Sequence, residues 1–469
     1  MLITKPSDLD PVSPEPIELS RSLLDRLASI RYDVLRALQA GDPVYGVNTG
    51  MGALSKVRLT EEEQRVHQRN LLLGRAVGGP PWLPYDEARA VLIGRLRTFL
   101  TGDAGVSVEL IERLVAFINS GLVPAIPAQG AGSAGEIIPL AHAFGPLVGI
   151  GSVLAPTVAD PRPAEGLLPP FELGPKEGIA LLAGIPGATG RAALQAAHAG
   201  RLADHLSAVA AGAIAVIGAN RDPYHPQTAR GDEILTTELA RILELAGPEV
   251  EPRSLQAPVS FRVAGQVIAH VRRSLAYLVE AVDRAFAGVT DSPAYLSGEF
   301  IGTAGFHGID LAAHCDHLTA ALAHAAEVST ARIHRLLDPA VTGLPAQLAH
   351  DPGPQAGLVA VHKRAVATSH GLRRLTLPSA ISTAETSNGQ EDVQSFSWEA
   401  VGVLADAIRL TREITACELL AVHQAFALSK RAVPPGLRDF LQSVADVVPP
   451  IDLDRPLGQD LTNLLALLT

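Results

Sequence analysis

Candidate chemistry is concentrated in the segment 126–145, which reads IPAQGAGSAGEIIPLAHAFG. Its glycines bracket the pair Ser133-Ala134, and glycines at this density let the backbone approach itself or a ligand closely. Glu136 then opens an apolar segment, at the point where the N-terminus of a helix carries partial positive charge. No charged residue occurs from Ile137 to Val158, so we expect a long, buried helix there. The segment predicts a reactive or ligand-binding loop; a tight turn before a core helix is the alternative.

A second candidate is the segment Val44–Leu54, which reads VYGVNTGMGAL. It contains three glycines and no helical period, so it predicts a loop. Tyr45 in this loop would act as a general base only if its pKa were lowered. A buried tyrosine hydroxyl that is satisfied by the backbone is the alternative interpretation.

Both segments carry a resemblance to a known family. GSAGEIIPLAH resembles the signature of the histidine and aromatic amino acid ammonia-lyases, and YGVNTGMG is similar to their Tyr-Gly-Val-Asn-Thr-Gly-Phe-Gly stretch. In that family an Ala-Ser-Gly triplet cyclises into the electrophilic group methylidene-imidazolone (MIO), and the tyrosine is the catalytic base. The resemblance implies that Tyr45 is the acid/base. It also lays Ser133-Ala134-Gly135 on the triplet, with Ala134 at the position of the central serine.

The alanine at position 134 has a direct chemical consequence. The exocyclic methylidene of MIO arises when the serine hydroxyl leaves as water, and the Cβ of Ala134 carries no leaving group. Gly135 would still let the backbone close a ring, but that ring would lack the electrophilic carbon. We therefore expect that this chain forms no MIO and that it uses no other cofactor.

Other matches to the family concern substrate binding. Arg75 stands where the family usually has a histidine that contacts substrate, and an arginine at a pocket favours a carboxylate or phosphate. A solvated arginine at a helix end is the alternative. In QAPVSFRVAGQV, Gln256 and Arg262 match the family, whose arginine binds the substrate carboxylate through bidentate donors. An ion pair along a helix is the alternative for Arg262.

The resemblance also implies roles for Phe306, which is retained in GTAGFHG, and for Gln390 and Glu391, which are retained in GQED. In the family this glutamate lies near the substrate amine or ring, so we take Tyr45 and Glu391 as the catalytic candidates. For the GQED motif, a solvated acidic loop is the alternative interpretation. The departures fall where the family makes or supports its electrophile or binds the amine; besides Ala134 they are Ala183, Val259 and Gly305.

The elements that must position these residues are overwhelmingly helical. Apolar residues at helical spacing predict helices over 20–39, 86–100, 108–120, 191–217, 356–375 and 397–428, and Thr60 with Glu63 forms a capping box that opens another. With the resemblance, this predicts a mainly α chain with the ammonia-lyase (L-aspartase/fumarase-like) fold and a long central helical bundle. We expect a domain over residues 1–200 that carries both loops, and a long-helix bundle domain over residues 201–469.

Composition excludes several classes of function. A net charge of −11 argues against nucleic acid, which selects basic surfaces. Two cysteines give no disulfide framework, and the polar, Pro-rich first residues predict no signal peptide, so we expect a cytoplasmic protein that does not insert into a membrane. The cluster of His307, His314, Cys315 and His317 lacks a fourth ligand at zinc-like spacing, so we expect no metal site.

The sequence leaves three functions open. The first is an MIO-independent enzyme in which Tyr45 transfers protons on a small carboxylate-bearing substrate, by cyclisation or conjugate addition, isomerisation or elimination. The second is an MIO ammonia-lyase or aminomutase inactivated by Ser→Ala at position 134, and the third is a non-catalytic ligand-binding pseudoenzyme. The resemblance also implies a homotetramer with shared active sites, in which Tyr45, Arg262 and Glu391 come from different chains.

Overall fold

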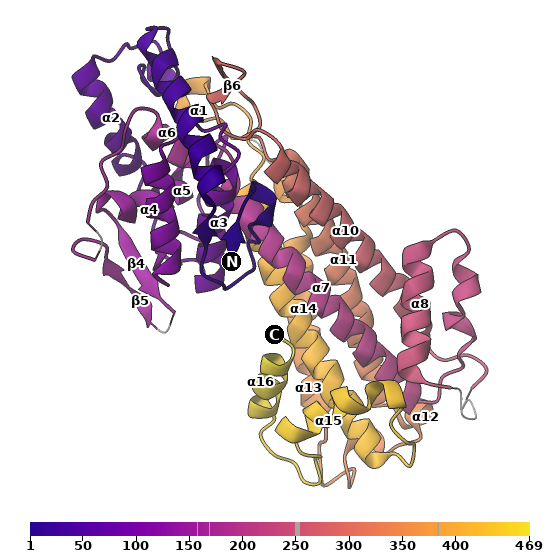
Figure 1. Ribbon diagram of the computed structural model, residues 1–469. Helices are drawn as coiled ribbons and strands as arrows, with labels where there is room; N and C mark the ends of the chain where they lie inside the picture. Colours follow the sequence, from indigo (N-terminus) through magenta and orange to yellow (C-terminus); the bar gives the residue numbers. More distant parts are fainter. Residues whose placement is uncertain (157, 168, 249–253, 382–383) are drawn as a thin grey trace. The chain divides into compact units, whose positions relative to one another are not determined.

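The computed structural model describes residues 1–156, 158–167, 169–248, 254–381 and 384–469, and most of them lie in helices (Figure 1). The chain divides into two compact units. The first contains Met1–Gln195, Leu278–Cys315 and Pro378–Gly402, and the second contains Ala196–Tyr277, Asp316–Leu377 and Val403–Thr469. The mainly α character is as predicted. The division differs from the one expected, because two segments beyond residue 201 belong to the first unit.

The first unit is built on short and medium helices whose ends are fixed by side chains. Ser20 accepts the backbone N–H of Leu23 and caps the first helix. The capping box predicted at Thr60 and Glu63 is present, with both reciprocal hydrogen bonds. These contacts satisfy N–H groups that a helix end otherwise leaves unpaired. The helices are α1 (Arg21–Gln39), α2 (Glu61–Leu73), α3 (Tyr85–Phe99), α4 (Val108–Asn119), α5 (Ile137–Phe144) and α6 (Glu177–Leu182).

The long helix expected over Ile137–Val158 is not formed, and this prediction is wrong. The helix α5 ends at Phe144, and a short 3-10 turn covers Gly145–Val148 before Gly149 adopts a positive φ of 78°. Pro146 has no N–H to donate to the preceding turn, and glycine adopts the left-handed conformation without a Cβ clash. The described residues of this uncharged run therefore form a helix, a turn and a strand rather than one helix.

Short strands complete the first unit, and none of them was anticipated from the sequence. β1 (Leu2–Ile3) pairs in parallel with β2 (Glu18–Leu19), while β6 (Ala294–Leu296) pairs antiparallel with β7 (Glu299–Ile301). An antiparallel sheet has the order β3-β4-β5, and its strands are β3 (Val123–Pro124), β4 (Ser152–Ala155) and β5 (Val158–Pro163). In this sheet β4 pairs antiparallel with β5, with Val153 opposite Arg162.

The boundary between Leu377 and Pro378 lies outside the helices, and the other unit boundaries fall inside the four longest helices of the described residues. These are α7 (Pro186–Val216), α10 (Ala264–Ala287), α11 (Ile309–Leu336) and α14 (Ser397–Leu428). Shorter helices of the second unit are α8 (Glu233–Ala246), α9 (Val259–Arg262), α12 (Pro339–Thr342), α13 (Val359–Arg373), α15 (Arg438–Val447) and α16 (Gly458–Leu467). Within this unit α11 is tied to α14 by buried Arg332, which donates to Glu418 at 2.6 Å. No helix in the described part of the chain is long and apolar enough to span a bilayer.

Candidate active site

A cavity of about 590 Å³ that contains candidate chemistry lies wholly within the first unit. That volume is in the usual range for small-molecule sites. It brings together sequence motifs that are far apart in the chain. The predicted residues that line it are Tyr45, Ala134, Gly135, Ala183, Phe306, Gln390 and Glu391. Tyr45 and Glu391 meet at a cavity of a single chain, which differs from the expectation that they come from different chains.

Tyr45 is held at the mouth of this cavity by its own loop. Its hydroxyl oxygen accepts the backbone N–H of Gly52 at 2.7 Å, and 38% of the side chain is exposed. Loop geometry is fixed nearby by Asn48, whose side chain accepts the N–H of Val44 and donates to the carbonyl of Asp42. The hydrogen bond fixes the position of the phenol oxygen, which is the atom that would exchange a proton with a substrate.

The loop 133–135 is tied to the segment that carries Glu391. The N–H of Ala134 donates to Oε2 of Glu391 at 3.1 Å, and Thr386 donates its hydroxyl to the same oxygen at 3.1 Å. Within the loop, the Ser133 hydroxyl donates to the carbonyl of Gly135 at 2.9 Å. The carboxylate is thus fixed by two donors, and the side chain of Ala134 at the cavity wall is a methyl group.

Glu136 fastens the same loop to the start of α7. It is fully buried, and its two oxygens accept the N–H groups of Gly187 at 2.8 Å and Ala188 at 2.7 Å. These are N–H groups that the first turn of α7 cannot satisfy internally. Burial raises the pKa of Glu136 to about 7, although the two hydrogen bonds and the nearby Arg95 and Arg191 oppose that shift.

Buried charged side chains lie next to the cavity wall that residues 182–184 form. Arg95 donates to the carbonyls of Ala183 and Leu181, and burial lowers its pKa to about 10. Beside it, Lys176 is fully buried and pairs with Asp291 at 2.8 Å. Asp291 directly precedes two further lining residues, Ser292 and Pro293. Removing one partner of such a buried pair is costly, so these ions fix the walls of the cavity.

Arg75 lies close to this site but lines a neighbouring cavity of the first unit. It donates to the carbonyl of Leu71 at 3.2 Å and contacts the sulfur of Met51 at 3.7 Å. Burial lowers the pKa of Arg75, while the charges of Tyr45 and Glu391 act in the opposite direction. The guanidinium is therefore near both catalytic candidates, and its predicted role in substrate binding stays a prediction.

The remaining predicted site residues belong to the second unit. Gln256 and Arg262 line a cavity of about 420 Å³ there, and the buried Nε of Arg262 has no hydrogen-bond partner among the described residues. Val259 begins the short helix α9 and is 59% exposed, so it lines neither cavity. The substrate roles predicted for these three residues stay predictions.

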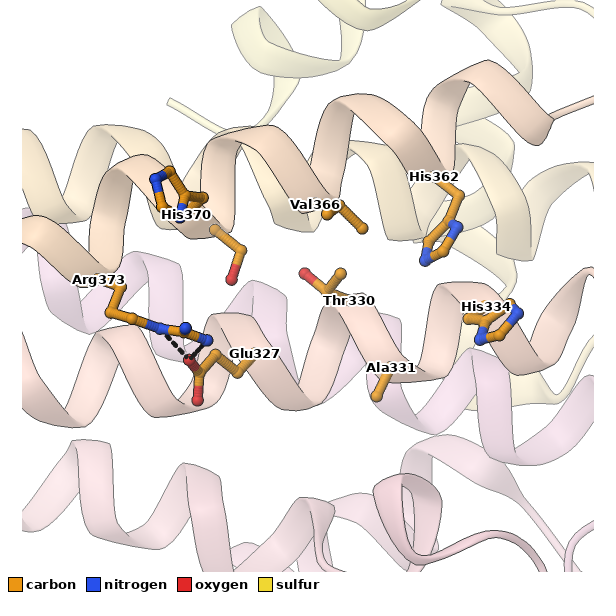
Figure 2. Close-up of a pocket in the computed structure, with 9 residues that line it drawn as sticks. Glu327, Thr330, Ala331, His334, His362, Val366, His370 and Arg373 are labelled. Atoms are coloured by element: carbon orange, nitrogen blue, oxygen red, sulfur yellow. Dashed lines mark hydrogen bonds and ion pairs between the residues drawn. The ribbon is translucent and has the colours of Figure 1, made fainter.

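The second unit also has an open groove between α11 and α13, with a volume of about 390 Å³ (Figure 2). The rings of His334 and His362 stack there, with centroids 4.9 Å apart and planes inclined by 10°. Arg373 pairs with Glu327 at 2.7 Å on the same groove. Its arginine and carboxylate neutralise one another, and none of the family motifs contributes to it. The first-unit cavity is therefore the better candidate for chemistry.

Sequence reasoning missed much of the apolar lining of the first-unit cavity. Nothing in the sequence showed that Ser292 and Pro293 would line the same cavity as Tyr45. Met51 stands inside the tyrosine motif, where the family has phenylalanine, and that substitution was a usable signal. The other missed lining residues are Pro43, Val44, Ile137, Ile179, Leu182, Gly184, Phe300, Gly302, Asp392 and Val393.

Comparison with known proteins gives consistent matches over the whole chain. The family model described as aromatic amino acid lyase matches residues 6–446. Histidine ammonia-lyase of Symbiobacterium thermophilum is 31% identical, over 96% of this chain and 92% of the relative, and that of Deinococcus radiodurans is 30% identical, over 96% and 89%. Tyrosine aminomutase from Streptomyces globisporus matches with a TM-score of 0.91 at 26% identity, over 99% of this chain and 95% of that chain.

Proposed function

Because the chain belongs to the aromatic amino acid lyase family, we propose that it is an enzyme of the lyase or isomerase type that works without MIO. In this proposal Tyr45 is the general acid/base, Glu391 is the second catalytic group, and a small carboxylate-bearing substrate occupies the cavity of about 590 Å³. Arg75 supplies positive charge near the reacting groups from the same chain. The reaction is a cyclisation or conjugate addition, an isomerisation, or an elimination.

One observation carries this proposal: the side chain at the cavity wall where the family forms its electrophile is the methyl group of Ala134. A methyl group cannot leave as water, so this triplet has no route to a methylidene. Ala183, which replaces the supporting asparagine, has no amide to hydrogen-bond such a ring. The residues present do not fit MIO, and no step of the proposed reaction passes through it.

Proton transfer at Tyr45 needs no electrophilic group if the substrate proton is already acidic. The hydrogen bond from the N–H of Gly52 holds the phenol oxygen of Tyr45 in place at the cavity. Met51 and Phe306 give the cavity apolar walls, which strengthens the attraction between Arg75 and an anionic substrate group. Substrates that carry a better leaving group than ammonia, or their own electrophile, fit these requirements.

A second candidate function is an MIO ammonia-lyase or aminomutase that was inactivated by substitution at position 134. What favours it is the identity of about 30% with two histidine ammonia-lyases, together with the match to a tyrosine aminomutase. Under this alternative Ala134 is the only obstacle to MIO, so restoring a serine there should restore activity.

Intact mass spectrometry of the purified chain, with the near-ultraviolet spectrum, tests the first proposal. We expect the mass of the unmodified sequence and no absorbance attributable to MIO; a mass lower by two waters would contradict the proposal. Ala134→Ser, assayed for ammonia release from histidine, phenylalanine and tyrosine, separates the two candidates. We expect no efficient release, because Ala183 and Val259 still lack supporting hydrogen-bond groups. Robust release would favour the inactivated lyase.

A further inference from the structure

Two cavities of the first unit share one wall, and the shared residue is Met51. On one side is the candidate catalytic cavity with Tyr45 and Glu391. On the other side is a cavity of about 310 Å³ between the tyrosine loop and α2, which we call the distal compartment. It is lined by Gly50, Met51, Leu54, Val57, Leu59, His67, Asn70, Leu71 and Arg75. Because the two spaces adjoin at a single flexible side chain, one elongated ligand could occupy both.

Arg75 stands at the same wall as Met51. Its guanidinium contacts the Met51 sulfur at 3.7 Å, and its charge interacts with Tyr45 and Glu391 on the catalytic side, while the residue itself lines the distal compartment. Burial lowers the pKa of Arg75, but an arginine remains protonated near neutral pH. An anionic group of a ligand would therefore be held at the junction of the two spaces.

The distal compartment has the lining of a subsite for an apolar chain. Its aliphatic residues include Leu71, which is 1% exposed at the base, and Leu54 and Val57, which are 65% and 51% exposed at the rim. His67 is one of the polar residues in this lining. The Nε2 atom of His67 is buried and has no hydrogen-bond partner among the described residues. Burial and the charge of Arg75 lower the pKa of His67, so the ring is neutral near pH 7 and adds no charge.

Met51 has the properties of a gate between the two spaces. Its side chain is unbranched with three rotatable bonds, so it can swing aside at lower cost than an aromatic ring. A phenylalanine at this position would present a rigid ring and would close the passage.

Resting on the proposed function, we propose that the distal compartment binds the apolar arm of the substrate and that Met51 sets how long this arm can be. The substrate class is a carboxylate with two arms, such as an N-acylated amino acid. Its carboxylate lies beside Arg75, its reacting side chain lies in the catalytic cavity, and its acyl chain passes Met51. The compartment volume of about 310 Å³ accommodates a chain of several carbons.

Calorimetric titration with N-acyl-phenylalanines that differ only in acyl length, from acetyl through butanoyl and hexanoyl to octanoyl, tests this proposal. Transfer of one methylene out of water is worth about 0.8 kcal/mol, so we expect the affinity of the wild-type protein to rise roughly fourfold for each methylene that enters the compartment. Met51→Phe should abolish this dependence on length while it still binds the acetyl member. Met51→Leu, the matched control, should retain the dependence.

Arg75→Met separates the subsite from the anion anchor. It should weaken every member of the series by a similar factor and leave the dependence on acyl length unchanged. Wild-type binding that is independent of acyl length would overturn the subsite but leave the proposed function standing, whereas no binding of any member would contradict both.

A second copy of the chain, rather than a substrate arm, is the other possible occupant of the surface at Leu54 and Val57, and the same experiments distinguish the two. The wild-type affinities would then be independent of acyl length, and Val57→Asp would lower the mass measured by light scattering. That pair of results would also overturn the subsite.

Discussion

At the scale of single residues, the site combines the proposed acid/base Tyr45 with an alanine at the position where the family has the serine of its electrophile. Tyr45 keeps its loop and receives the N–H of Gly52, and Glu391 is fixed by Ala134 and Thr386. Glu391 therefore both lines the cavity and holds the loop in which the family forms MIO. In our proposal the chemistry of this arrangement is proton transfer, which depends on the phenol of Tyr45.

Tyr45→Phe removes the proton-transfer group and one hydrogen bond, and it leaves the ring in place. General acid–base assistance contributes about 10² to 10⁴-fold, so we expect kcat to fall by that order once a substrate is identified. Stability should change by only about 1 kcal/mol, because a single hydrogen bond is lost. Steady-state kinetics and thermal denaturation measure the two effects. Unchanged turnover in Tyr45→Phe would exclude the tyrosine from the mechanism.

At the scale of secondary structure, buried charges link helix ends to the cavity. Glu136 joins the short helix α5 to the first turn of α7, and Arg95 joins α3 to the carbonyls of Leu181 and Ala183. Both contacts lie beside residues that line the cavity, which are Gly135 and Ala183.

The buried carboxyl of Glu136 gives a specific dependence of stability on pH. Its pKa in the folded protein is about 7, which is above the value of 4.5 for the free side chain. The unfolded chain therefore loses its proton first. The stabilisation is fully present below about pH 4.5 and is lost as the pH rises through 7. A shift of this size corresponds to roughly 3 kcal/mol.

Glu136→Gln provides the matched comparison, because glutamine has nearly the same shape and does not titrate. We expect the free energy of unfolding of the wild type, relative to Glu136→Gln, to fall between pH 4.5 and 7 and to level off above that range. Urea denaturation across this range measures the difference. A relative stability that rises with pH would show that the hydrogen bonds and the neighbouring arginines outweigh burial.

At the scale of the whole molecule, assembly decides whether the second-unit residues take part in the reaction. Arg262 and Gln256 line a cavity of their own, and the buried Nε of Arg262 lacks a partner among the described residues. Because the chain belongs to this family, we propose that it forms a homotetramer with shared active sites. In such an assembly a neighbouring chain would supply Arg262 to the cavity that contains Tyr45.

Light scattering and subunit complementation test this assembly. We expect a tetramer at micromolar concentration, and a stable monomer would refute the shared site. Arg262→Ala should mainly raise KM if the anion is held equally in the ground and transition states. Mixed tetramers of Tyr45→Phe and Arg262→Ala chains should recover part of the activity, because some sites then combine an intact tyrosine with an intact arginine. No recovery after mixing would indicate that both residues act within one chain.

The sequence by itself determined the helical content, the family and a part of the residues around the cavity. Helical periodicity and local capping needed only neighbouring residues, so the helices starting after Ser20 and Thr60 were predicted correctly. The family model and the match in fold confirm the predicted resemblance and fold class. The absence of a leaving group at Ala134 is likewise a property of one side chain, and it required no coordinates.

Only the tertiary structure decided how distant segments meet. The end of α5 depends on packing that a run of apolar residues does not specify, since a buried strand and a buried helix can have the same composition. The pairing of Lys176 with Asp291 joins residues that are far apart in the chain. Met51 lines two cavities whose other lining residues come from different segments. Such contacts depend on the packing of the whole core, because the position of each side chain is limited by the side chains packed around it.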